Sequence, residues 1–440
     1  MKRSFLIIAL LMVALWSVAA IIGDQPAQAQ EGDIPEENQQ GEIIVLRGEI
    51  TKNMTLKAKK RYLLEGGVFV RAGATLKIKP GTTIFAGERS FLVIDRGAKI
   101  IAKGKANKPI IFTSAQDVGK RKRGDWGGLI LNGFAPINAP SGEADGEGGT
   151  GKYGGKNPDD NSGILQFVRV EFAGFPLTPT NELNGIAFQG VGRGSIVENI
   201  EIIESGDDAM EFFGGTVNVK RILLIGAMDD GFDWTGGWQG KAQFVIIQQD
   251  GSIEANNGIE ADNDQNNNDL EPRSKPTLFN FTILGDAQTK TGSSIGMLLR
   301  VGTAGRLVNF IVQNYKDVGV RIKDQSTINQ LNSGSLSLES IIFFNNQKGS
   351  TQFQNNDGSS AGDLSGLFRG VRTMDPLLTS PFSKDAPNFR PQAGSPALDG
   401  PFVIAPPSND PFFEKVTFIG GMGPDAKDDW TKGWTSFRRN

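Results

Sequence analysis

A small residue followed by an apolar one opens a strand-like run at six places between residues 185 and 320. The pairs are Gly185-Ile186, Ala209-Met210, Gly231-Phe232, Gly258-Ile259, Ser294-Ile295 and Gly319-Val320. The steps between them are 24, 22, 27, 36 and 25 residues. Short strands that recur at such steps are typical of solenoids, in which each repeat buries its apolar face only against its neighbours. The spacing therefore predicts a stack of similar coils.

The runs themselves are of β type. From residue 61 onward, short apolar runs such as residues 91–94 (Phe-Leu-Val-Ile) alternate with Gly, Asn and Asp. No stretch keeps a helical period over three turns, and the 57 glycines would interrupt long helices. Leucine-rich repeats share the period, but their Leu-Asn pattern is absent. We therefore expect an all-β, right-handed parallel β-helix of about ten coils, in which equivalent residues stack about 4.8 Å apart.

The first 29 residues have the organisation of a secretory signal peptide. Lys2 and Arg3 precede an uncharged apolar run over residues 5–22, and residues 27–29 (Ala-Gln-Ala) form a small-x-small cleavage site. The alternative is an uncleaved anchor helix, because a run of about 18 residues approaches the length that spans a bilayer. We favour cleavage and expect a secreted, periplasmic or outer-surface protein with no membrane span in its mature form.

Both ends of the chain differ from the β-helix body, which we assign to residues 61–375. Residues 30–60 are expected to form an N-terminal cap over the open end of the core. Residues 376–411 hold nine of the 21 prolines, and proline cannot donate a hydrogen bond to a strand ladder. We therefore expect residues 376–440 to form a Pro-rich extended segment and a tail, with Trp430 and Trp434, that packs on the solenoid.

The composition excludes several chemistries. The chain has neither Cys nor His, so thiolate catalysis, His-ligated zinc and Ser-His-Asp systems are impossible. Its 46 basic and 49 acidic residues nearly balance, whereas nucleic-acid binders usually carry a basic surplus. We therefore expect no nucleic-acid partner.

Carboxylates recur at one position of successive repeats. Glu211, Asp233 and Glu260 each follow the apolar residue of a pair, so they should stack one coil apart. Like charges about 5 Å apart near a surface repel by on the order of 3 kcal/mol. A bound Ca²⁺ ion, a shared proton or a basic side chain such as Arg321, two coils further on, could offset this repulsion.

The acidic positions near this column form the candidate metal site. They are Asp207, Asp208, Glu211, Asp229, Asp230, Asp233, Glu260, Asp262 and Asp264. The last three members at residues 260, 262 and 264 alternate, so they can face one way. The alternative interpretation is that Asp residues here are ordinary turn residues.

A succession of motifs runs from residue 72 to residue 218. It includes Ala72-Gly73-Ala74-Thr75-Leu76, Lys79-Pro80-Gly81-Thr82-Thr83-Ile84, Trp126-Gly127-Gly128-Leu129-Ile130-Leu131 and Glu211-Phe212-Phe213-Gly214-Gly215. These motifs resemble secreted bacterial parallel β-helix proteins of the pectin-lyase-like fold class, which are common on the surfaces of Bacteroidetes and mostly have no assigned activity. The resemblance covers nearly the whole mature chain. It implies the fold and export, and it does not imply one reaction.

Enzymes of this fold class suggest two activities. Pectate lyases use Ca²⁺ to acidify the proton beside a uronate carboxylate, and a basic side chain removes it. The resemblance would make Arg300, Arg321 or Lys323 that base. Polygalacturonases hydrolyse with paired carboxylates, and residues 206–208 (Gly-Asp-Asp) and 321–323 (Arg-Ile-Lys) resemble two pieces of their signature. The third piece, Gly-His-Gly, is impossible in a chain without His.

Three tryptophans offer a different role. Trp126, Trp234 and Trp238 lie among glycines, and exposed aromatic faces on a β-helix would suit sugar stacking. The alternative is core packing, because large aromatic side chains are usually mostly buried.

These observations predict a secreted or cell-surface protein that binds polysaccharide or extracellular matrix, with Ca²⁺ at an acidic corner. A first alternative is a Ca²⁺-dependent uronate lyase, or a carboxylate-based glycoside hydrolase, acting at the same corner. A second is a passive structural or adhesin module in which the acidic residues are turn chemistry.

Overall fold

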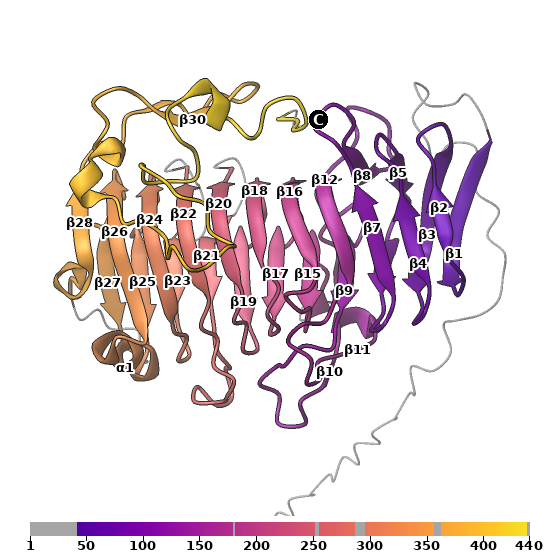
Figure 1. Cartoon of the computed structure of the whole chain (residues 1–440), viewed down its shortest axis with the longest axis horizontal. Coiled ribbons are helices and arrows are strands. Elements are labelled where there is room, and N and C mark those ends of the chain that lie inside the picture. The colour runs from indigo at the N-terminus through magenta and orange to yellow at the C-terminus, as the bar shows by residue number, and fades with distance from the viewer. Residues whose placement is uncertain (1–41, 179–180, 251–254, 287–294, 356–361, 438–440) are drawn as a thin grey trace, which may run out of the picture.

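The computed structural model describes residues 42–178, 181–250, 255–286, 295–355 and 362–437. Over these ranges 24 strands join into one continuous sheet network whose pairings are parallel, and the chain rises coil by coil along one axis (Figure 1). The predicted all-β, right-handed parallel β-helix is confirmed. The predicted signal peptide lies outside the described residues.

One face of the solenoid, which we call the column sheet, is formed by eleven strands among the described residues. They are β1 (Ile43–Ile50), β3 (Arg61–Val70), β6 (Phe91–Ile94), β9 (Leu129–Asn132), β15 (Ile186–Gln189), β17 (Met210–Phe213), β19 (Phe232–Thr235), β21 (Asn257–Ala261), β23 (Ile295–Leu299), β25 (Val320–Lys323) and β27 (Thr351–Gln354). One strand per coil agrees with the prediction of about ten coils.

Two further faces complete each coil. Their strands are β2 (Met54–Leu56), β4 (Thr75–Ile78), β5 (Thr83–Ala86), β7 (Lys99–Lys103), β8 (Ile110–Ser114), β12 (Gly163–Glu171), β16 (Ile196–Ile203), β18 (Val219–Ile225), β20 (Lys241–Gln248), β22 (Thr277–Leu284), β24 (Gly305–Gln313), β26 (Leu336–Phe344) and β28 (Arg369–Thr373). The strand β12 pairs with β7 in its first part and with β8 in its second part. From β12 onward one bent strand therefore serves both faces.

The bend in these long strands is made by residues in the left-handed backbone region. Phe167, Asn199, Arg221, Phe244 and Asn280 have φ between 51° and 61° and occupy equivalent positions in the paired strands. Only Asn adopts this conformation at moderate cost, so the phenylalanines and the arginine are held there by the ladder on either side.

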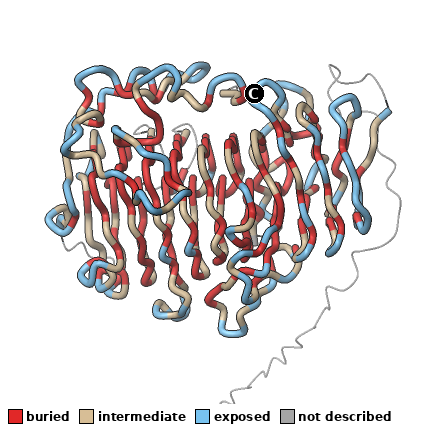
Figure 2. Tube along the Cα trace, viewed as in Figure 1, coloured by how far each residue is buried: buried red, intermediate tan, exposed pale blue. Residues whose placement is uncertain are grey.

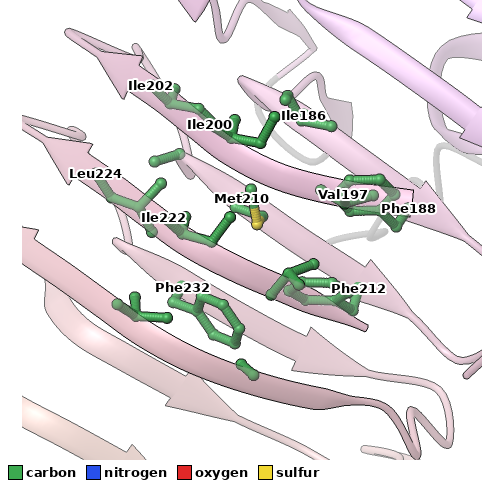
Figure 3. Close-up of a cluster of buried hydrophobic side chains, with 14 of the residues drawn as sticks. Ile186, Phe188, Val197, Ile200, Ile202, Met210, Phe212, Ile222, Leu224 and Phe232 are labelled. Atoms are coloured by element: carbon green, nitrogen blue, oxygen red, sulfur yellow. The ribbon is translucent and has the colours of Figure 1, made fainter. Parts of the chain in front are cut away.

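The core is a stack of inward-facing side chains, one layer per coil (Figure 3). Phe188, Phe212 and Phe232 follow one another, with ring centroids 5.3 Å and 5.0 Å apart. In the strands that carry them, every second residue points inward, which is the period of a β-strand. Burial is continuous along the solenoid interior, and exposure concentrates at the loops (Figure 2).

One element of the sequence-based register is wrong. The strand β21 pairs with β23 so that Ile259 lies opposite Met297, and Met297 lies opposite Val320. The equivalent small-apolar pair in this coil is therefore Gly296-Met297, two residues after the predicted pair at residues 294–295. A slip of two residues preserves the alternation of inward and outward side chains, so the local pattern cannot detect it.

Smaller elements lie on the loops. They are β10 (Ala144–Asp145) with β11 (Lys152–Tyr153), β13 (Pro176–Thr178) with β14 (Asn181–Glu182), β29 (Leu378–Ser380) with β30 (Asn388–Pro391), the helix α1 (Gln325–Ser333) and the 3₁₀ turns η2 (Glu147–Gly149), η3 (Ser365–Leu367), η4 (Pro396–Leu398), η5 (Gly400–Phe402) and η6 (Ala426–Asp428). The Asp324 side chain caps α1 by accepting a hydrogen bond from the Thr327 N–H. No helix in the described part of the chain has the length and hydrophobicity needed to cross a bilayer.

The C-terminal segment crosses the outside of the coils and ends beside β12 (Figure 1). A second apolar cluster joins it to the solenoid, in which Ile419 and Met422 pack with Ile246, Leu284 and Ile311. Backbone carbonyl groups of the segment accept hydrogen bonds from side-chain amides of β20, β22 and β24. The apolar cluster and these hydrogen bonds together hold the segment against the later coils.

Candidate functional site

Three acidic side chains stack on the column sheet where the sequence predicts them. The strands β17, β19 and β21 pair so that Glu211 lies beside Asp233 and Asp233 lies beside Glu260. Their neighbours along each strand point into the core, so the carboxyl groups lie on the outer face. The predicted stacking is confirmed, and we call these three residues the acidic column.

The Asp residues that precede β17 and β19 form a corner beside the acidic column and act partly as turn residues. Asp208 Oδ1 accepts a hydrogen bond of 2.9 Å from the Asp230 N–H, and Asp230 Oδ1 accepts one of 2.6 Å from the Asn257 N–H. Asn256 donates its side-chain amide to Asp229 Oδ1 at 2.7 Å. These turn contacts use one oxygen of each carboxyl group, so turn chemistry and a cation site are compatible here.

The column and the corner bring carboxylate oxygens together in three overlapping groups. They are Asp207 with Asp208 and Asp229, Asp208 with Glu211 and Asp233, and Asp230 with Asp233 and Glu260; the oxygens in each group lie within 4.8 Å of one another. Asp233 Oδ1 is buried and has no hydrogen-bond partner among the described residues. Hard cations such as Ca²⁺ prefer oxygen-only ligand sets of this kind.

Burial and mutual repulsion shift the protonation of these groups. The pKa values of Asp208, Glu211, Asp230 and Asp233 lie well above their usual range, first because burial penalises the charged form and second because neighbouring carboxylates repel it. The same causes raise the pKa of Asp207 to about 8. Without a cation, the cluster therefore retains protons near neutral pH.

Two further carboxylates, which the sequence analysis did not single out, lie over the corner. Glu147, in η2, and Glu182, in β14, come from two separate loops. Burial and Glu182 raise the pKa of Glu147 to about 7, and Glu182 also contributes to the raised pKa of Asp207. Asn184 donates a hydrogen bond to Glu211 Oε2. Glu147 lies within residues 141–163, and the Gly- and Asp-rich composition of that range is the one sequence signal that marks its loop as unusual.

The arginines proposed as lyase bases are engaged in ion pairs. Arg300 bonds to Glu260 and, through Nε at 2.8 Å, to Asp262 Oδ1. Burial alone would lower the pKa of Arg300, but these two carboxylates raise it above its ordinary value. Arg321 lies two strands beyond Glu260 in the column sheet, as predicted, and Leu298 separates the two.

Arg321 is equally occupied. Its Nη2 lies 2.6 Å from Asp317 Oδ2, and its Nε donates to Gln352 Oε1 at 2.9 Å. Lys323 points outward from β25 and lines a depression of about 340 Å³ together with Arg300 and Asp324. Of the three candidate bases, only Lys323 is outside an ion pair in the described residues.

The alternating acids at residues 260, 262 and 264 do not act as one set. Asp262 is buried and lies against Arg300 with Glu260. Asp264 instead accepts hydrogen bonds from the N–H groups of Asn266 and Asn267 at 2.9 Å and 2.8 Å. The expectation that Asp264 faces the column with the other two is wrong, because the chain leaves the strand at Ala261 and turns.

The prediction that three tryptophans form a sugar platform is also wrong. Trp126, Trp234 and Trp238 are 0% exposed, and each indole N–H donates to an internal oxygen, for example that of Trp238 to Val217 O at 3.1 Å. The Trp238 ring stacks on Phe212 with centroids 4.1 Å apart. Trp234 follows Phe232 by two residues and therefore points inward with it.

Comparisons with known proteins agree with the architecture. A family model described as "Pectate-lyase like beta helix domain" matches residues 48–369. No curated protein and no solved structure gives a significant match.

Proposed function

The chain belongs to the pectate-lyase-like β-helix domain family, and on this premise we propose that it is a secreted or cell-surface protein that binds polysaccharide or extracellular matrix and holds Ca²⁺ at its acidic column. One observation carries the cation part of the proposal. Three groups of carboxylate oxygens overlap on adjacent coils, and one buried oxygen, Asp233 Oδ1, has no partner among the described residues. A buried acceptor without a donor is costly, and a cation would satisfy it.

The residues that would hold the ion are those of the central group. Asp208, Glu211 and Asp233 supply carboxylate oxygens, with Asp230 and Glu260 on the next coil. Bound Ca²⁺ would supply positive charge and a coordination position for hydroxyl or carboxylate oxygens of a glycan. Polysaccharide as the partner rests on the family rather than on the column itself.

A lyase activity at this corner is less well supported. That mechanism needs a basic side chain free to take a proton within reach of the sugar. Arg300 and Arg321 are both bound by carboxylates, which leaves Lys323 as the candidate base. We therefore place binding before catalysis, and we keep a uronate lyase that uses Lys323 as the second candidate.

The test is thermal unfolding of the mature protein in Ca²⁺ and in chelator, beside a Glu211→Gln/Asp233→Asn variant. Binding to the folded state alone should stabilise it by about 2.7 kcal/mol at a free Ca²⁺ concentration 100 times the Kd. This stabilisation should disappear in the variant. The matched control is Glu88→Gln/Asp385→Asn, which neutralises two exposed acids away from the column and should retain the Ca²⁺ response.

Two outcomes would count against the proposal. If Ca²⁺ does not raise the melting temperature of the native protein, the column is not a calcium site. If the control loses the response as fully as the column variant, the effect is general screening and not binding at Asp233. Turnover of polygalacturonate that Lys323→Ala abolishes would instead favour the lyase.

A further inference from the structure

The C-terminal segment and the solenoid enclose a cavity of about 320 Å³ at the corner of β18 and β20. The solenoid contributes Phe244 and Arg221, two of the residues at the bend of the long strands. The segment contributes Phe418 and Trp430. Phe244 and Phe418 stack with centroids 6.2 Å apart and planes inclined by 28°, so the cavity has aromatic walls from both partners.

The position of Trp430 is fixed by the segment itself. Its indole N–H donates to Gly421 O at 2.9 Å, and the Gly421 N–H donates to Thr282 Oγ1 at 2.8 Å. A Cβ at Gly421 would lie 2.5 Å from Val245 O, so only glycine allows this close approach. The indole N–H is therefore already used, and the ring surface of the partly exposed Trp430 is what remains for a ligand.

The rim of the cavity is polar and carries both signs of charge. Glu414 accepts hydrogen bonds from Arg221 Nη2 at 2.8 Å and 2.6 Å. Lys427 and Asp428, in η6, also line the cavity. The lining holds three basic residues, Arg221, Lys415 and Lys427, and two acidic ones, Glu414 and Asp428. Because both signs are present and Glu414 is paired with Arg221, the opening is not a dedicated anion or cation site.

Aromatic walls and a mixed polar rim together match the chemistry of a sugar ring. The C–H faces of a pyranose pack on aromatic rings, while its hydroxyl groups both donate and accept hydrogen bonds at charged side chains. We propose that this cavity is a binding subsite for a neutral sugar unit of a polysaccharide, with Trp430 as its stacking surface. This inference rests on the polysaccharide part of the proposed function and does not involve the acidic column.

The structure divides the tryptophans differently from the sequence-based expectation. Trp126, Trp234 and Trp238, expected as sugar platforms, are buried. Trp430 packs against the solenoid cluster, as expected of the tail, and its remaining exposed surface lies beside the cavity.

The experiment measures binding of neutral oligosaccharides to the full mature protein by calorimetry in chelator. The probes are cellohexaose, xylohexaose, mannohexaose and galactohexaose, with oligogalacturonate as the charged counterpart. At least one neutral hexaose should bind, and Trp430→Ala should weaken that binding tenfold or more. Phe382→Ala removes another exposed aromatic ring of the same segment and should bind as the native protein does.

A second variant keeps the test decisive if Trp430→Ala detaches the segment. Val416 is partly buried and lines the cavity, so Val416→Trp should fill it while Trp430 stays in place, and binding should again fall tenfold or more. Limited proteolysis would show whether the segment remains docked in each variant.

The remaining outcomes separate this inference from the proposed function. Failure of all neutral hexaoses to bind, or binding that Trp430→Ala and Val416→Trp both leave intact, overturns the inference. Binding that appears only with Ca²⁺ and disappears in Glu211→Gln/Asp233→Asn would support the acidic column and overturn this site. Binding of oligogalacturonate alone also overturns it.

Discussion

The column sheet carries charge in two contrasting ways on adjacent coils. At Glu211 and Asp233, carboxylates stack on carboxylates, and no basic side chain among the described residues forms an ion pair with either. One coil further, Glu260 shares Arg300 with Asp262, and Arg321 is held by Asp317. The column sheet therefore contains an uncompensated stretch, Glu211 and Asp233, whose negative charges have no basic partner among the described residues. It also contains a compensated stretch, beginning at Glu260, whose carboxylates are paired with arginines.

The difference shows that repetition alone does not decide what such a ladder of charges does. In the compensated stretch, ion pairs within the protein neutralise the carboxylates. The uncompensated stretch keeps protons or requires a cation from solution. Glu211 and Asp233 are therefore the part of the acidic column whose state depends on pH and on divalent ions.

The largest effect is expected from pH in the absence of divalent ions. Burial and like charges raise the pKa values of Glu211 and Asp233 well above their usual range, that of the adjoining Asp207 to about 8 and that of Glu147 to about 7. The folded state therefore binds these protons more tightly than the unfolded state, so stability falls by several kcal/mol as the pH rises from about 5 to about 8. Urea unfolding in chelator across this range measures it, and Ca²⁺ should flatten the curve.

A stability that is constant or rises between pH 5 and pH 8 in chelator would mean that the uncompensated stretch carries no excess protons. The comparison between the two stretches would then lose its basis.

The next effect is the loss of the compensating cation. Arg300→Gln leaves Glu260 and the almost fully buried Asp262 without their partner, and breaking a buried pair costs about 3–5 kcal/mol. Urea unfolding should show this loss, and a second change, Glu260→Gln, should recover part of it. Arg193→Gln removes an exposed pair with Asp159 and should cost less than about 1 kcal/mol; equal losses in both variants would contradict the assignment.

Neutralising the uncompensated stretch should act in the opposite direction. In chelator at pH 8, Glu211→Gln/Asp233→Asn removes repulsion between stacked carboxylates and should stabilise the protein by up to about 3 kcal/mol. The matched change in the compensated stretch, Glu260→Gln, should destabilise it because Arg300 loses a partner. Relative to the native protein, the denaturation midpoints of the two variants should shift in opposite directions. Shifts in the same direction would contradict the contrast between the two stretches.

The smallest effect is expected at Asp264, which lies outside both stretches. Asp264→Ala removes one turn carboxylate that accepts two backbone hydrogen bonds and should cost about 1 kcal/mol. The Ca²⁺-dependent rise in melting temperature should remain. A loss of that rise would mean that Asp264 is a ligand after all and that the cation site extends into the loop.

Part of the candidate site was predictable from local pattern. The acidic column and the place of Arg321 in it follow from the small-apolar pairs and from alternation along each strand. Calcium, export and the nature of the partner stay predictions. Local pattern did not reveal that Arg300 is the counter-ion of Glu260, that Glu147 and Glu182 lie over the acidic corner, or that Trp238 is buried. Each of these features depends on how loops of different length fold back on the coils.

The sequence by itself determined a parallel β-helix, the face on which each strand residue lies and the order of charges along the column. These features have a fixed short period, so neighbouring residues reveal them. Only the tertiary structure decided which carboxylates are neutralised, which tryptophans are buried and where the C-terminal segment leaves a cavity. Those outcomes depend on contacts between residues far apart in the chain, such as Phe244 with Phe418, and no local period encodes such contacts.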